Sequence, residues 1–110
     1  MDATKRKKLE AAGWRVGSAK EFLGLTTEEA VLIDLKLALG DLVRSARQRA
    51  RLSQQALANR LGSSQSRVAK LEAGDASVSL DLIVKAALVA GARRSDLARA
   101  IARRSRLATG

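Results

Sequence analysis

A short polar segment at residues 64–70 carries the side chains best suited to recognition by hydrogen bonds. Gln65, Ser66 and Lys70 fall within it, and the alanines beside them leave room for close approach. Glutamine, serine and lysine hydrogen-bond to base edges; glutamine suits adenine, lysine suits guanine, and an alanine methyl can contact thymine. These positions form the start and middle of a predicted helix at 64–73. We therefore predict that this helix contacts base pairs in a major groove.

Two short helices joined by a tight turn are needed to position these side chains. Residues with cap preferences stand at the expected boundaries: Ser53, Gly62, Ser63 or Ser64, and Gly74. Serine is a favourable N-cap, and glycine takes the positive φ of a helix C-terminus without steric cost. The first helix is predicted at about 54–61. Two such helices around a glycine-containing turn form a helix-turn-helix, here at 53–73.

Apolar residues at helical spacing predict how the two helices pack. Leu57 and Leu61 lie one turn apart on the first helix, and Val68 and Leu71 lie at i, i+3 on the second. These four side chains can form one small core. Ala58 is expected where the helices cross, and a larger residue there should push them apart.

A longer helix is predicted before this motif. Thr26 and Glu29 form a capping box, and a strong helical pattern follows from about residue 27. We expect Gly40 to bend or break it, with a second helix continuing to Arg51. The expected core face comprises Val31, Leu32, Leu35, Ala38, Leu39, Leu42, Val43 and Ala46.

Three apolar residues interrupt the polar face of this helix. Ala30, Ile33 and Leu37 lie at i, i+3, i+7 and form a stripe. Two interpretations stay open: the stripe is covered by the N-terminal segment, or it is a surface for a partner or a second copy of the chain.

Two further helices are expected after the motif. Ser79 is the predicted N-cap of a helix at 80–90, and backbone N–H groups at this N-terminus suit a phosphate. Its expected core residues are Leu80, Ile83, Val84, Ala87 and Leu88. A last helix at about 95–104 is expected to place Leu97, Ala98 and Ile101 inward.

Composition restricts the class of function. The chain has 110 residues and a formal net charge of +10, which favours a polyanionic partner. It has neither histidine nor cysteine, so we expect no enzyme, no metal site and no cofactor. No apolar run is long enough to span a bilayer and no signal peptide is apparent. We expect a cytoplasmic, nucleoid-associated protein without a membrane partner.

The expected organisation is an all-α helix-turn-helix bundle with an extra N-terminal helical segment. Residues 1–26 are predicted to form a basic arm with a short helix at about 4–12. Trp14 and Phe22, the chain's aromatic residues, are expected to cover the core edge. Residues 27–104 form the predicted DNA-binding domain, and 105–110 a tail.

The stretch 52–74 resembles the Xre-type helix-turn-helix of the phage Cro and CI repressors. The shared pattern is Ser-Gln-x-x-Leu-Ala, followed by Gly-x-x-x-x-x-Val-x-x-Leu-Glu-x-Gly, and the similarity extends over about 41–91. The resemblance implies a lambda-repressor-like five-helix bundle that binds a near-palindromic DNA operator as a homodimer. It implies base contacts by Gln65, Ser66 and Lys70. Phosphate contacts are assigned to Gln54, Ser64, Arg67 and Ser79, and a structural ion pair to Arg47 and Glu72.

A wider resemblance covers most of the chain. The segments Phe-Leu-Gly-Leu-Thr-x-Glu-Glu-Ala at 22–30 and Gly-Ser-Ser-Gln-Ser-Arg-Val-Ala-Lys-Leu-Glu-Ala-Gly-Asp at 62–75 are similar to those of HigA-like antitoxins. This similarity implies a repressor that also neutralises a RelE-fold toxin. The alternative is a stand-alone Xre-type repressor with no toxin partner.

Overall fold

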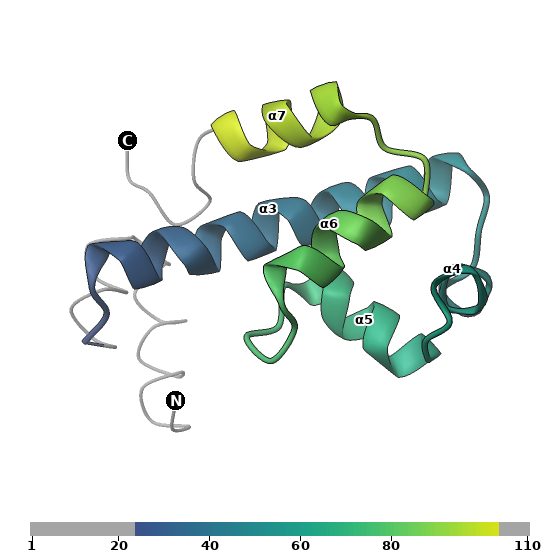
Figure 1. Ribbon diagram of the computed structural model, residues 1–110, viewed down its shortest axis with the longest axis horizontal. Coiled ribbons are helices and arrows are strands. Elements are labelled where there is room, and N and C mark those ends of the chain that lie inside the picture. Colours follow the sequence, from purple (N-terminus) through teal and green to yellow (C-terminus); the bar gives the residue numbers. More distant parts are fainter. Residues whose placement is uncertain (1–23, 104–110) are drawn as a thin grey trace, which may run out of the picture. The chain divides into compact units, whose positions relative to one another are not determined.

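The computed structural model describes residues 24–103, which form helices joined by short turns (Figure 1). The helices are α3 (Thr27–Arg49), α4 (Gln54–Leu61), α5 (Gln65–Ala73), α6 (Leu80–Val89) and α7 (Arg94–Ala102). No strand occurs in this part of the chain, and the all-α prediction is confirmed. The expectations for the helix at 4–12, for Trp14 and Phe22, and for the tail at 105–110 lie outside the described residues.

Residues Leu35–Arg103 form one compact unit around an aliphatic core. In Figure 1, α4 and α5 lie below the C-terminal half of α3, and α7 lies above it. Helices α4, α5 and α6 pack against one another. The largest fully buried side chains are Leu39, Val43, Leu57, Val68, Leu71, Val78 and Ile83. Leu57, Val68 and Leu71 therefore meet as expected, and Leu61 packs against this cluster while remaining half-buried.

The predicted helix boundaries are confirmed where a local cap sets them. Thr26 and Glu29 form the capping box: each backbone N–H donates to the other residue's side chain, at 2.9 and 3.1 Å. The N-caps of α4, α5 and α6 are Ser53, Ser64 and Ser79, each accepting a backbone N–H near the start of its helix.

The prediction of a bend or break at Gly40 is wrong. Helix α3 is continuous from Thr27 to Arg49, and Gly40 is buried within it. A Cβ at this position would lie 2.7 Å from the carbonyl oxygen of Leu71 and 2.8 Å from that of Glu72. The glycine therefore lets the backbone of α5 lie directly on α3, which is a reason for its presence unrelated to helix bending.

Several predicted core positions are exposed instead. Val31 and Leu32 on α3 are 52% and 44% exposed, because the buried part of that helix begins at Ala38. Leu88 on α6 is 46% exposed, and Ala86 is buried in its helix.

The predicted inward face of α7 is right for Leu97, which packs against the core, and wrong for Ala98 and Ile101. Ile101 is 53% exposed, Ala98 is exposed and Leu97 is half-buried, whereas Asp96 and Ala100 are buried. The backbone N–H of Arg93 donates to Asp96 Oδ2 at 2.8 Å, and Arg99 also donates to this carboxylate. Asp96 thus caps the helix from a buried position, and this contact sets the face that α7 turns inward.

Candidate nucleic-acid interface

Helix α5 has one face in the core and one face in solvent. Val68 and Leu71 are fully buried, while Gln65, Ser66 and Lys70 are exposed. Glycine-mediated contact with α3 and burial of these two apolar side chains fix the helix from behind. The three polar side chains singled out from the sequence are therefore brought together on the free surface.

A hollow of about 340 Å³ lies beside the N-terminal half of α5. Its lining residues are Ser64, Ser66, Arg67, Lys70, Ser77 and Val78. Ser64 Oγ accepts the backbone N–H of Arg67 at 3.2 Å and lies 3.2 Å from Ser66 Oγ. Within residues 24–103, neither Arg67 nor Lys70 forms an ion pair. The hollow thus presents hydroxyl groups and the cations of Arg67 and Lys70, a combination suited to phosphate oxygens.

The first residues of α4 and α5 are joined by their side chains. Gln65 Nε2 donates to Gln54 Oε1 at 2.5 Å, and Gln54 Nε2 donates to Glu72 Oε1 at 3.1 Å. Gln54 is half-buried and Gln65 is exposed. This arrangement places the N-termini of both helices side by side.

The carboxylate of Glu72 receives most of the polar contacts behind α5. Arg47 donates to it through Nε at 2.5 Å and through Nη2 at 3.1 Å, and Arg44 Nε lies 3.4 Å away. The side chain of Glu72 is 1% exposed. Its burial acts to raise the pKa, but the hydrogen bonds from Arg47 and Gln54, the charge of Arg47 and the hydrogen bond from Arg44 together lower it below the ordinary value. Glu72 is therefore ionised at neutral pH.

The loop between α5 and α6 is held by contacts that sequence reasoning missed. Lys36 Nζ donates to the carbonyl oxygen of Ala76 at 3.1 Å. Asp75 Oδ1 accepts from the N–H and Oγ of Ser77 at 2.8 and 2.6 Å, and these bonds lower the pKa of Asp75. A short-range Asp-x-Ser pattern could have indicated the second contact. No sequence signal indicated the first, because Lys36 lies far from the loop along the chain.

A comparison with protein-family models gives a match described as a helix-turn-helix domain, over residues 38–100. The chain belongs to this helix-turn-helix family. It is a DNA-binding domain of the Xre-like kind. Searches of curated proteins and of solved structures find no match.

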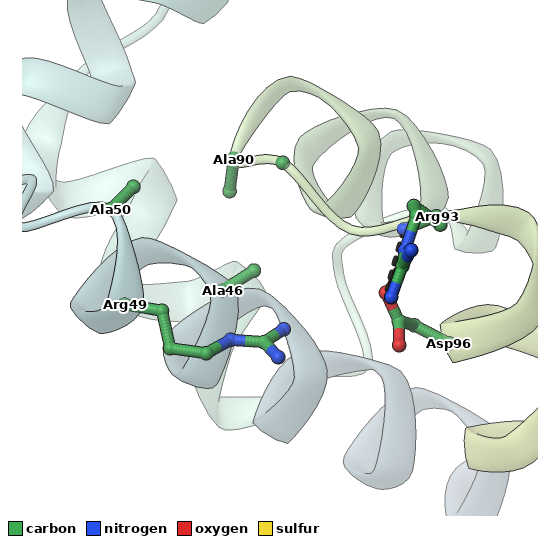
Figure 2. Close-up of a pocket in the computed structure, with 7 residues that line it drawn as sticks. Ala46, Arg49, Ala50, Ala90, Arg93 and Asp96 are labelled. Atoms are coloured by element: carbon green, nitrogen blue, oxygen red, sulfur yellow. Dashed lines mark hydrogen bonds and ion pairs between the residues drawn. The ribbon is translucent and has the colours of Figure 1, made fainter.

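Other surfaces of this helix-turn-helix protein are chemically different from the α5 face. Figure 2 shows a hollow lined by α3, the end of α6 and the start of α7, with Arg49 extending along its floor. The carboxylate of Asp96 lies 3.9 Å from Arg93 Nε, and its pKa is lowered first by the backbone N–H of Arg93 and also by nearby arginines. No buried side-chain N or O atom in the described part lacks a hydrogen-bond partner. The carboxylate in this hollow is thus already held by arginines of the protein itself.

The stripe predicted on α3 is only partly accessible. Ala30, Ile33 and Leu37 are each half-buried, whereas Val31 and Leu32 are exposed. The accessible apolar surface on this part of α3 therefore includes Val31 and Leu32 beside the half-buried stripe. Within residues 24–103, no helix is both long enough and apolar enough to cross a bilayer.

Proposed function

We propose that the protein is a homodimeric repressor that binds a near-palindromic operator in double-stranded DNA. The observation that carries this proposal is the exposed polar face of α5, presented by a helix-turn-helix whose two N-termini lie together. In this arrangement α5 enters the major groove, and Gln65, Ser66 and Lys70 contact base edges.

The phosphate contacts come from the residues around this face. Arg67 and Ser64 belong to the hollow beside α5, and Gln54 stands at the first position of α4. Ser79 caps α6, whose backbone N–H groups suit a phosphate on the flanking DNA. These contacts hold the protein on the duplex, and the base contacts supply sequence preference.

Selection of bound sites from a random DNA pool, repeated at two salt concentrations, tests the proposal. We expect one enriched motif with near-palindromic halves, and a dimer on that motif in sedimentation analysis. Salt-dependent binding without any enriched motif would contradict sequence-specific repression.

We further propose that the protein is the antitoxin of a toxin–antitoxin pair with a RelE-fold toxin. The partner surface is the stripe of Ala30, Ile33 and Leu37 together with its exposed neighbours Val31 and Leu32. This apolar surface and the similarity to HigA-like antitoxins support the function. The alternative is a stand-alone Xre-type repressor.

Co-expression with the product of an adjacent reading frame distinguishes the two. For an antitoxin, a small basic protein encoded there should co-purify, and Val31→Glu with Leu32→Glu should abolish that complex while preserving DNA binding. Absence of such a frame, or a complex unaffected by both substitutions, would favour the stand-alone repressor.

A further inference from the structure

The turn between α3 and α4 contains a residue in an unusual backbone conformation. Arg51 has a φ of 57°. Among residues 24–103, all other residues with a positive φ are glycines. An L-residue in this left-handed region places its Cβ too close to the following carbonyl oxygen, which is unfavourable. Its side chain is exposed, so no packing contact in the core explains its presence.

The same helix ending occurs elsewhere in the chain with glycine. At the end of α3, the N–H of Arg51 donates to the carbonyl of Gln48 and that of Leu52 donates to Arg47, both at 3.0 Å. This is the hydrogen-bond pattern of a Schellman motif, which favours glycine at the left-handed position. The equivalent positions after α4, α5 and α6 are occupied by Gly62, Gly74 and Gly91. Only at the α3–α4 turn, within the described residues, does a charged side chain take this place.

This turn is attached to the recognition helix. Arg47 Nη1 donates to the carbonyl oxygen of Leu52 at 2.9 Å, and the same guanidinium binds Glu72 of α5. Arg51 is thus joined directly to a residue fixed by the network behind α5. It also precedes Gln54 by three residues, a span of at most about 11 Å.

The charge of Arg51 is not paired within residues 24–103. Arg44 and Arg47 on α3 pair with Glu72, whereas Arg51 forms no ion pair or hydrogen bond through its side chain within residues 24–103. Helix α5 itself carries only Arg67 and Lys70 as basic residues. A free guanidinium beside the N-terminus of α4 would add to the positive charge that faces the DNA backbone.

We propose that Arg51 is a DNA phosphate contact. Its strained protein backbone conformation is kept because the guanidinium binds a DNA phosphate beside the N-terminus of α4. This inference rests on the proposed DNA-binding function. If it is right, replacing Arg51 by glycine raises the stability of the fold and lowers the affinity for DNA.

Arg51→Gly provides the test. We expect the melting temperature to rise by about 2–6 °C as the backbone strain is relieved. Affinity for a duplex selected from the random pool, and for a shuffled duplex, should fall by the same factor, about five- to tenfold near 0.1 M salt, and the salt slope should fall by about 0.9. Fluorescence anisotropy across a salt titration measures both.

Three control variants separate the effect of the positive charge on DNA binding from the effect of the backbone conformation. Arg51→Lys should keep the salt slope, and Arg51→Asn should lose it although asparagine tolerates the left-handed conformation. Arg94→Ala removes the same charge from an exposed position at the start of α7 and should leave the slope unchanged. If wild-type protein binds the duplexes and Arg51→Gly and Arg51→Asn match its affinity and slope, Arg51 is no contact. If wild-type protein binds neither duplex, the proposed function itself is wrong.

Discussion

Lys70 and Arg67 carry the same charge on the same helix, yet the proposed contacts differ. Lys70 is assigned to a base edge, where the donor pattern matters, and Arg67 to a phosphate, where charge alone matters. Both line the hollow beside α5, and both are exposed. The distinction is therefore measurable by comparing cognate with shuffled DNA.

For Lys70→Ala, we expect a loss of about 1–3 kcal/mol in binding the selected operator and a relaxed preference at one base pair. The physical reason is the loss of direct hydrogen bonds to that base. Competition binding against single-base operator variants measures it. An equal loss on all sequences would show that Lys70 contacts the backbone.

For Arg67→Ala, we expect weaker binding to every sequence and a salt slope lower by about one, because one phosphate contact and its released counterion are lost. A salt titration on both selected and shuffled DNA measures this change. A sequence-dependent effect with an unchanged slope would contradict the phosphate assignment.

At the scale of the helices, the sequence predicts features that depend on nearby residues but not those that depend on contacts between distant segments. The caps at Thr26, Ser53 and Ser79 are predictable because a cap depends on residues three positions apart, and the third helix cap is predictable to within Ser63 or Ser64. The role of Gly40 could not be predicted, since it depends on the crossing of α3 with a segment about thirty residues later.

The face of α7 shows the same limit. Hydrophobicity favours Leu97 and Ile101 as inward residues. Leu97 packs against the core, but Ile101 is exposed and the fully buried positions are Asp96 and Ala100. The carboxylate is satisfied by Arg93 and Arg99, so a charged residue can lie in a position that a hydrophobicity pattern assigns to solvent.

The hydrogen bond between Gln54 and Gln65 also depends on how two helices cross. The sequence indicates both residues individually, but not the bond between them.

Gly40→Ala should separate the packing role of this glycine from helix propensity. Alanine gains about 1 kcal/mol of propensity, but overpacking against the carbonyls of Leu71 and Glu72 costs up to about 3 kcal/mol, so we expect a net loss of up to about 2 kcal/mol. Urea denaturation measures this free energy of unfolding.

The matched control is Gly62→Asn. A Cβ at Gly62 meets no atom within 4 Å, so only its left-handed backbone restricts the residue. Asparagine tolerates that conformation, and the loss of stability should be smaller than for Gly40→Ala. Higher stability of Gly40→Ala than of wild type would contradict the close contact between α3 and α5.

For the molecule as a whole, acid should weaken the fold. Within the described residues, hydrogen bonds and neighbouring positive charges lower the pKa of the carboxyl groups of Glu29, Glu72, Asp75 and Asp96. A carboxylate with a lower pKa in the folded state stabilises the fold above its ordinary pKa. That contribution is lost as the pH falls through the folded-state value. We therefore expect the free energy of unfolding to decline below about pH 4.

Glu72→Gln isolates the buried carboxylate within this general effect. The amide keeps the shape but cannot ionise, so the variant should be less stable than wild type at pH 7. The two stabilities should converge as the pH falls, because protonated Glu72 loses the same attraction to Arg47. Urea denaturation at several pH values measures the difference, and a gap that stays constant down to pH 3 would contradict the role of Glu72 in the acid response.

In the hydrogen bonds behind α5, the donor and acceptor of each bond are fixed in order from the buried carboxylate of Glu72 to the exposed amide of Gln65. The ionised carboxylate of Glu72 can only accept, so the amide of Gln54 must turn its NH₂ group toward it. The oxygen of Gln54 then faces Gln65, whose amide must donate one N–H. Gln65 is left with a carbonyl oxygen and one N–H, the acceptor and donor pair that matches an adenine edge. The orientation of an exposed amide is thus dictated by a carboxylate two hydrogen bonds behind it. A donor in place of Glu72 would reverse both amides in turn.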